Sequence, residues 1–304
     1  MDISQTLGRV GCTGTVCAAP LAGGPAVEYL ADELVTPGSV MKIQVALAAL
    51  NAVATGRLAG TRRVLLAADS RTPGPVGVSL MADDVEISVR DLVPLMMTIS
   101  DNVATDALID LIGLPVINDL TDALGLDRTH IASDLMTMLD DTARELGFAH
   151  YSALAAFTPD ESGEMSSDVI RQRLATTSAL DPTRGARTTA RETVRLLQLI
   201  WTDQAAAPEA CGQLRRTMGQ QLTRHRIAAG FGPDVAVAAK SGGLMGILRN
   251  EAGVVRYPDG QEYAVAVFTR SDPRTRADER AVNAAIGEIA AQAVTLLRSP
   301  GRSL

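Results

Sequence analysis

Residues 36–50 read TPGSVMKIQVALAAL, and this stretch decides how the rest of the chain is interpreted. A Thr-Pro-Gly turn precedes an apolar run with helical periodicity, so Ser39 is predicted at or just before the first helical turn. Lys42 follows one turn later on the same face, where its amine can reach the Ser39 hydroxyl. A lysine can activate such a serine if burial or a neighbouring cation lowers the lysine pKa. The plainer interpretation is a helix cap beside a solvated lysine.

Lysine usage favours the chemical interpretation. The 304 residues include 28 lysines and arginines, yet Lys42 and Lys240 are the only lysines. An arginine keeps its proton in a protein, whereas a lysine can be tuned toward neutrality. Both lysines are therefore candidates for a role in chemistry.

Composition describes a globular protein with a large core, since 46% of the residues are hydrophobic and 21% are charged. A net charge of -7 without a basic stripe argues against nucleic-acid binding. No apolar run is long enough for a membrane span, and the N-terminus lacks a signal-peptide pattern, so a cytoplasmic protein is expected. The three cysteines and three histidines have no metal-binding spacing, and neither a metal nor a cofactor is expected. The oligomeric state stays open.

Strand patterns occur at both ends of the chain and helical patterns fill the middle. The predicted fold is α+β, with a five-stranded antiparallel sheet flanked by the terminal helices and an inserted all-helical domain. The sheet domain is assigned to residues 1–36 and 230–304, and the helical domain to residues 37–229. A long irregular excursion at about 127–187 is typical of a functional loop with short helices of its own. The junction of the two domains is the expected place for a small-molecule ligand.

Two further motifs accompany S-V-M-K. Ser100-Asp101-Asn102 lies between two predicted helices, where it could be a simple polar corner. Lys240 lies near the end of a predicted strand that reads KSGG, whose glycines would let a ligand approach the backbone. In this order, S-V-M-K, S-D-N and K-S-G match the motif set of class A β-lactamases and penicillin-binding proteins. The sequence resembles the class A β-lactamase-like serine hydrolases over nearly its whole length, including the stretch MTISDNVATDALID.

The resemblance implies roles for the residues of the first two motifs. Ser39 would be the nucleophile that forms an acyl-enzyme, and Lys42 would be its base or part of the proton path. Ser100 would relay a proton to the leaving group. Asn102 would bind the acyl side of the substrate and help to hold Lys42.

The resemblance also implies a binding region around the third motif. Lys240 and Ser241 would bind a substrate carboxylate, and the backbone N–H groups of Ser39 and Gly243 would form the oxyanion hole. Arg249 follows Lys240 at the distance where some family members carry a carboxylate-binding arginine. The alternative is that Arg249 is a solvated strand residue.

One departure from the family concerns the release of the acyl group. Class A β-lactamases carry a water-activating glutamate after an Asp-Arg pair, but His130 stands at that position here. Arg187 replaces the acid that usually pairs with the loop arginine, so the loop must be built differently. His130, Glu161 and Glu164 are the candidates for a deacylation base.

Three functions remain open on the sequence. The first is an esterase, amidase or transacylase that acts through Ser39 on a small carboxylate-bearing, β-lactam-related or secondary-metabolite substrate. The second is a β-lactam-binding or sensing protein that is acylated without turnover, and the third is a divergent class A β-lactamase.

Overall fold

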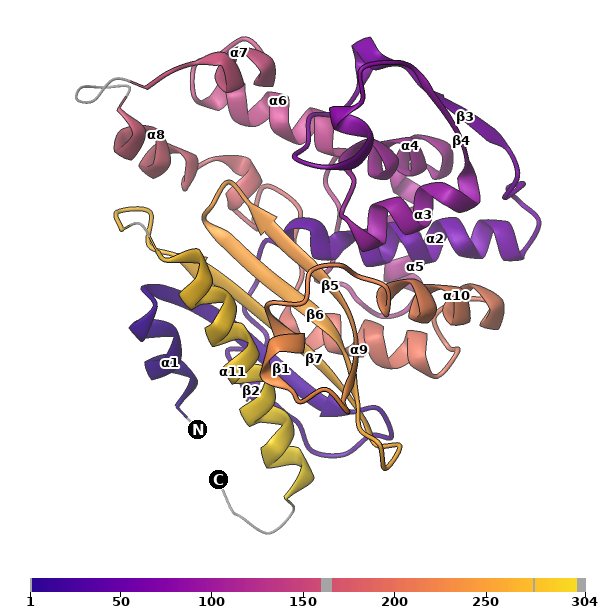
Figure 1. Ribbon diagram of the computed structural model, residues 1–304, viewed down its shortest axis with the longest axis vertical. Coiled ribbons are helices and arrows are strands. Elements are labelled where there is room, and N and C mark those ends of the chain that lie inside the picture. The colour runs from indigo at the N-terminus through magenta and orange to yellow at the C-terminus, as the bar shows by residue number, and fades with distance from the viewer. Residues whose placement is uncertain (1, 160–165, 276, 300–304) are drawn as a thin grey trace.

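The computed structural model of the chain describes residues 2–159, 166–275 and 277–299. Its main sheet has five antiparallel strands in the order β2-β1-β7-β6-β5 (Figure 1). The strands are β1 (Cys12–Pro20), β2 (Val27–Tyr29), β5 (Ala236–Leu244), β6 (Leu248–Arg256) and β7 (Glu262–Ser271). The two ends of the chain therefore meet in one sheet, where β1 pairs with β7.

Eleven α-helices lie within the described residues. They are α1 (Ile3–Arg9), α2 (Lys42–Ala54), α3 (Val89–Thr98), α4 (Asn102–Ile112), α5 (Leu114–Ala123), α6 (Leu135–Glu145), α7 (Tyr151–Ala156), α8 (Ser167–Leu174), α9 (Ala190–Trp201), α10 (Pro208–Met218) and α11 (Glu279–Arg298). Short 3₁₀ helices join them: η1 (Gly38–Met41), η2 (Ala68–Ser70), η3 (Gly77–Leu80), η4 (Ser178–Leu180) and η5 (Ile227–Gly230). Among the described helices, none combines the length and apolar character needed to cross a membrane.

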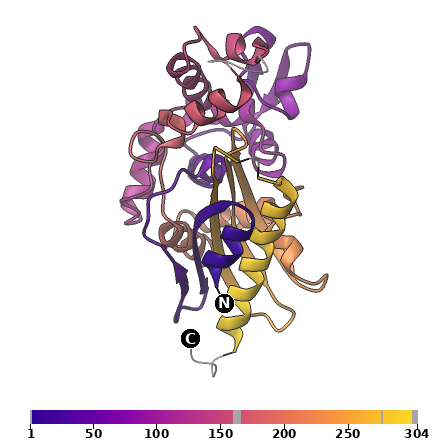
Figure 2. The same cartoon turned by 90° about the vertical axis from the view of Figure 1, so that its left-hand side faces the viewer.

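Helices cover both faces of the sheet. The terminal helices α1 and α11 lie together on one face, as Figure 2 shows, and α9 packs on the other. On β1, Val16 and Ala18 pack in the same cluster as Ile286 of α11, whereas Cys17 and Ala19 face the helices of the opposite side. Because both faces are buried, the strand reads as a nearly continuous apolar run rather than as an alternating pattern.

Helix α2 lies at the centre of the helical lobe. Ten of its thirteen residues are buried, and it contacts α3, α4, α5 and α10. The small and branched side chains of KIQVALAALNAVA allow close packing on every side. The residues that precede this helix are therefore held against a rigid core.

The predicted α+β fold and its five-stranded antiparallel sheet are confirmed. Ser39 lies just before α2, as predicted, in the 3₁₀ helix η1 that leads directly into that helix. One local detail differs from the sequence interpretation. The segment expected to be all-helical also contains a two-stranded sheet, formed by β3 (Arg63–Leu66) and β4 (Val85–Ser88).

Strand β5 and the η1 turn approach each other closely at Gly242. A Cβ atom added there would lie 2.7 Å from the carbonyl oxygen of Pro37 and 3.1 Å from the amide nitrogen of Val40. Backbone atoms cannot yield as the end of a side chain can. Any larger residue at this position must push the turn away from the strand.

We expect Gly242→Ala to lower the free energy of unfolding by about 1–3 kcal/mol, because the methyl group overpacks this backbone contact. Urea unfolding followed by circular dichroism measures the change. Gly8→Ala is the matched control, since a Cβ there meets nothing within 4 Å and Gly8 lies in α1, where alanine favours the helix. Equal stability of the two variants would contradict the packing argument.

Candidate active site

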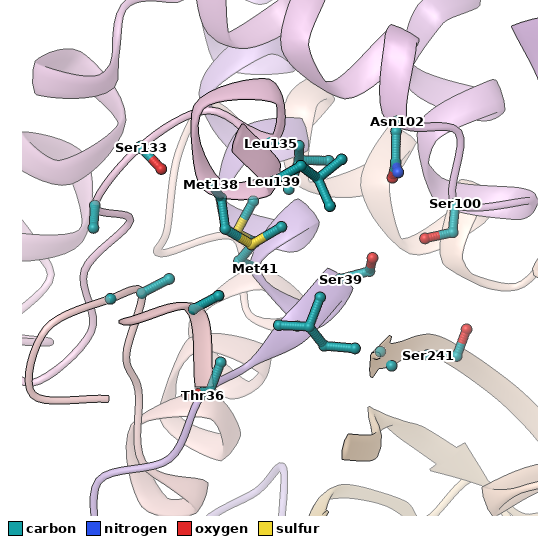
Figure 3. Close-up of a pocket in the computed structure, with 18 of the residues that line it drawn as sticks. Thr36, Ser39, Met41, Ser100, Asn102, Ser133, Leu135, Met138, Leu139 and Ser241 are labelled. Carbon is teal, nitrogen blue, oxygen red and sulfur yellow. The ribbon is translucent and has the colours of Figure 1, made fainter. Parts of the chain in front are cut away.

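A cavity of about 440 Å³ lies where η1, α4, β5 and α6 meet. Ser39, Ser100, Asn102 and Ser241 line one part of it, and Figure 3 shows these side chains grouped on the same side of the cavity. The serine, S-D-N and K-S-G motifs, which are far apart in the sequence, therefore come together at one place.

The turn that carries Ser39 is fixed from the sheet side. The side-chain nitrogen of Asn250 on β6 donates to the carbonyl oxygens of Thr36 and Pro37, each at 3.0 Å. Gly38 has a φ of +54°, a conformation that favours glycine, and its Cα faces the amide nitrogen of Gly243. The Ser39 hydroxyl has no hydrogen-bond partner among the described residues, and it points toward Ser100 in Figure 3.

Lys42 is completely buried below this turn. Its Nζ donates to the Ser100 carbonyl at 2.7 Å and to Asn102 Oδ1 at 2.9 Å, and it lies 3.2 Å from Ser100 Oγ. Burial lowers the pKa of Lys42 to about 7, against the opposing charges of Asp101 and Asp106. A substantial fraction of the amine is therefore neutral near pH 7 and able to accept a proton.

Ser100 has a strained backbone that aims its side chain into the cavity. Its φ is +65°, which is uncommon for a residue with a Cβ. The next residue, Asp101, is fully buried and holds the corner: its carboxylate accepts from the amides of Val78 at 2.7 Å and Ala104 at 2.9 Å. The second bond caps α4. The same corner presents Ser100 to the cavity and its carbonyl to Lys42.

Lys240 is also fully buried, and its Nζ donates to the Ser241 carbonyl at 2.8 Å. Burial, and secondarily the charge of Lys42, lowers the pKa of Lys240 well below its usual value. Glu251 on β6 adds a buried carboxylate to this region and accepts from the Gln221 side chain at 3.0 Å and from the Ile227 amide at 2.6 Å. The two lysines thus share one desolvated region, in which the charge of Lys42 disfavours the charge of Lys240.

Arg226 lines the cavity as well, although the sequence did not single it out. Its guanidinium is buried and donates to Asn283 Oδ1 at 2.9 Å and to the carbonyls of Gly242 and Asn250 at 2.7 Å. These bonds use Nε and Nη1. Arg226 lies in a segment without strand or helix periodicity, so no pattern in the sequence distinguishes it from other arginines.

Arg249, by contrast, is not among the described residues that line the cavity. It forms an ion pair with Glu279 at the start of α11. Strand pairing explains its position, because Arg249 lies opposite Gly243 and its side chain leaves the sheet on the α11 side. The structure therefore does not bring this predicted carboxylate-binding residue to the site.

The predicted deacylation bases are not brought to the cavity either. His130 is absent from the described lining, and its backbone forms a β-bridge with Arg187 through two hydrogen bonds of 2.9 Å. Burial and the charge of Arg187 lower the pKa of His130. Glu161 and Glu164 lie outside the described residues.

The neck of the long excursion is closed by backbone pairing and by an acid from α9. Glu192 accepts from the amide of Arg128 at 3.0 Å and from the hydroxyl of Thr129 at 2.6 Å. These bonds and the β-bridge between His130 and Arg187 hold the two ends of the excursion together, in place of the family's ion pair between an acid and the loop arginine. The excursion is thus built differently, as the sequence indicated.

Helix α6 forms the wall of the cavity on the excursion side. Leu135, Met138 and Leu139 line the cavity from one face of the helix, at the i, i+3, i+4 spacing. Asp141 is the only acidic residue among the described lining, and it pairs with Arg144 at 2.6 Å. This wall was not predicted from the sequence, although its amphipathic spacing was a usable signal.

Known proteins resemble this chain over nearly its whole length. Residues 2–297 match the family model described as the beta-lactamase enzyme family. The beta-lactamase regulatory protein BlaB of Streptomyces cacaoi is 29% identical over 284 residues, which cover 89% of this chain and 88% of that protein.

Two solved structures are similar over almost the whole chain. A beta-lactamase from Sphaerobacter thermophilus superimposes with a TM-score of 0.74 and 25% identity, covering 98% of this chain and 97% of that one. A mutant of PBP-A, described as an acyl-enzyme complex with penicillin G, has a TM-score of 0.73 and 21% identity, covering 97% and 95%. The match over 296 of the 304 residues shows that this chain belongs to the beta-lactamase enzyme family.

Proposed function

We propose that β-lactams, or related acyl donors that carry a carboxylate, acylate Ser39 and that the acyl group is released slowly. This is the behaviour of a β-lactam-binding or sensing protein. The observation that carries the proposal is the contrast between the two sides of the cavity. The groups needed for acylation are gathered on one side, and Leu135, Met138 and Leu139 of α6 form an apolar wall beside them (Figure 3).

Acylation begins when Ser39 Oγ attacks the carbonyl carbon of the donor. Its proton passes to the neutral amine of Lys42, whose pKa of about 7 suits this task. The Ser100 hydroxyl, 3.2 Å from Lys42 Nζ, gives a proton to the leaving nitrogen as the carbon–nitrogen bond breaks. Ser100 then takes a proton from Lys42, and the acyl ester on Ser39 remains.

The amides of Ser39 and Gly243 are the proposed oxyanion donors. Strand β5 is an edge strand, and the Ser241 amide on its open side donates to Gln221. Amides two residues apart on a strand point the same way, so the Gly243 amide also leaves the open edge, toward η1. Two backbone donors that face a developing oxyanion contribute several kcal/mol to transition-state stabilisation, on the order of 2.7–4 kcal/mol for one donor.

The carboxylate of the donor is proposed to bind beside Ser241. Arg226 provides positive charge there, and its Nη2 makes no hydrogen bond to the described residues. Lys240 lies buried behind Ser241, where a ligand carboxylate would favour the charged form of this lysine. A guanidinium held by three protein oxygens is already oriented, so a carboxylate that binds it loses little side-chain entropy.

Release of the acyl group needs a water molecule and a base to activate it. A well-placed general base is worth roughly 10² to 10⁴ in rate. Next to the catalytic groups the α6 wall presents Leu135 and Leu139, and Asp141, the carboxylate of α6 among the described lining residues, is paired with Arg144. Slow release follows from this arrangement. The relative BlaB, which is named a regulatory protein, supports a role in sensing rather than in bulk hydrolysis.

A second candidate is turnover of small esters or acyl transfer to another acceptor. Asp141 favours it, because this carboxylate lines the cavity and its pair with Arg144 is exposed and exchangeable. Steady turnover of a p-nitrophenyl ester that Asp141→Asn abolishes would support this function. The proposed slow-release function instead predicts a single burst from the ester, unchanged by that substitution.

The rate of acylation should depend on the ionisation of Lys42. We expect the second-order rate constant for benzylpenicillin to rise about tenfold per pH unit below pH 7 and to level off above it, because only the neutral amine accepts a proton. Stopped reactions analysed by intact mass give the profile. Lys42→Arg should lose at least about 10² in rate, since a guanidinium stays protonated. A flat pH profile would contradict the role of Lys42 as a base.

Incubation with benzylpenicillin should produce a lasting covalent adduct. We expect intact mass to show one penicilloyl group per chain, still present after the free drug is removed, because the leucine side chains of the α6 wall cannot activate water. Peptide mapping should place it on Ser39, and Ser39→Ala should give no adduct. Rapid return to the unmodified mass with accumulating hydrolysed drug would show that the protein is a β-lactamase instead.

A carboxylate placed in the α6 wall should speed release. We expect Leu135→Glu to raise the deacylation rate by roughly 10². Leu135→Gln is the matched control, since it has nearly the same shape but cannot act as a base. The decay of the penicilloyl adduct is followed by intact mass for both variants. Equal decay rates of the adduct in the two variants would show that a carboxylate at this wall does not speed release.

A further inference from the structure

The apolar wall of α6 also faces the space where the acyl side chain of a bound donor would lie. Figure 3 shows Met41, Leu135, Met138 and Leu139 between Ser100 and Ser133, which lie at opposite sides of the view. We infer that this part of the cavity selects donors whose acyl group carries an uncharged alkyl or aryl side chain. This inference rests on the proposed acylation of Ser39.

The wall is built in advance of any ligand. Asp106 on α4 accepts from the amides of Leu135 at 2.8 Å and Met136 at 2.9 Å, and so fixes the first turn of α6 to the helix that begins at Asn102. The Thr72 hydroxyl holds the same carboxylate at 2.6 Å. Because Asn102 and Asp106 are four residues apart on one face of α4, the start of α6 lies next to the catalytic groups.

The side chains of the wall suit an apolar ligand of variable shape. Leu135 and Leu139 are nearly buried, at 8% and 7% exposure, and their side chains therefore lose little conformational freedom when a ligand binds. Met41 and Met138 add two unbranched thioether side chains, which adapt to rings and to flexible chains. Ala179 and Ala186 also line the cavity, and their small apolar side chains leave room.

Farther along α6 from Leu135 the cavity lining becomes polar. Asp141 and Arg184 line this part, Arg184 is held by Asp181 at 3.0 Å, and Glu145 lies 3.8 Å from Arg184. Arg144 is shared between Asp141 and Asp140. Four carboxylates thus surround two guanidinium groups. An acyl side chain that ends in a carboxylate would meet repulsion here and would lose the apolar contacts of an uncharged chain.

The size of the expected selectivity follows from apolar burial. Each methylene buried against the wall should raise the second-order rate constant of acylation by about fourfold, if its full transfer free energy is expressed in the transition state. A chain of several methylenes therefore gains one to two orders of magnitude over a donor with no side chain.

The test compares four penicillins that share one nucleus: 6-aminopenicillanic acid, benzylpenicillin, heptylpenicillin and a penicillin whose acyl side chain is adipoyl. Acylation of Ser39 is timed by intact mass. We expect heptylpenicillin to react fastest, benzylpenicillin next, and both to exceed 6-aminopenicillanic acid and the adipoyl compound by about tenfold or more. Equal rates for all four compounds would overturn the inference and leave the proposed acylation intact. Failure of every compound to acylate Ser39 would overturn the proposed function itself.

Two matched substitutions locate the selectivity. Met138→Gln keeps the length of a partly buried wall residue but makes it polar, and it should reduce the advantage of heptylpenicillin over 6-aminopenicillanic acid at least about fivefold. Met81→Gln makes the same change at a residue that is 51% exposed and does not line the cavity, and it should leave the ratio unchanged. An unchanged rate ratio in Met138→Gln, with the fold intact by circular dichroism, would show that this wall does not cause the selectivity.

Discussion

The burial of the Lys42 amine is the constraint on which the rest of the site depends. An ammonium group without solvent is costly unless protein oxygens replace its hydration shell. The Ser100 carbonyl and Asn102 Oδ1 do this, and both belong to the corner between α3 and α4. That corner requires the positive φ of Ser100 and the buried Asp101 cap. The strain at Ser100 and the proton affinity of Lys42 are therefore parts of one arrangement.

Two buried lysines are tolerated because burial favours the neutral form of each amine. Both have pKa values lowered by burial, and the charge of Lys42 further disfavours the charge of Lys240. No acid among the described residues forms an ion pair with Lys240, and the nearby Glu251 is bound by Gln221 and by a backbone amide. A ligand carboxylate beside Lys240 would favour the charged form of that lysine. Binding of an anionic donor and the proton balance of the site are coupled in this way.

The sequence was sufficient for the architecture because the fold has strong local signals. The apolar run that follows Ser39, the strand patterns at both ends of the chain and the helical patterns in the middle all predicted elements that the structure contains. The division into a sheet domain of residues 1–36 and 230–304 and a helical domain of residues 37–229 stays a prediction. The roles of the motif residues likewise stay proposals, although the structure brings these residues together.

Side-chain direction and long-range folding were beyond the sequence. The sequence could not show whether Arg249 or Arg226 lines the cavity. A strand arginine points to one of two faces, and a residue in an irregular segment has no periodicity that places its side chain. Arg249 proved to face Glu279, and Arg226 the cavity. The α6 pattern predicts an apolar face, but what that face covers depends on how the excursion folds back. The bonds of Asp106 to the amides of Leu135 and Met136 help to hold this face as a wall of the cavity.

The position of α6 links two properties that could otherwise vary independently. The catalytic groups lie on η1, α4 and β5, which are held by the core and the sheet, whereas the wall belongs to the excursion. An apolar wall that attracts an apolar acyl side chain also keeps an acid and an ordered water away from the ester on Ser39, since both need polar partners. Changes that make the wall polar enough to support hydrolysis should therefore weaken its hold on apolar acyl groups. In this architecture, slow release and preference for apolar donors are two consequences of the same surface.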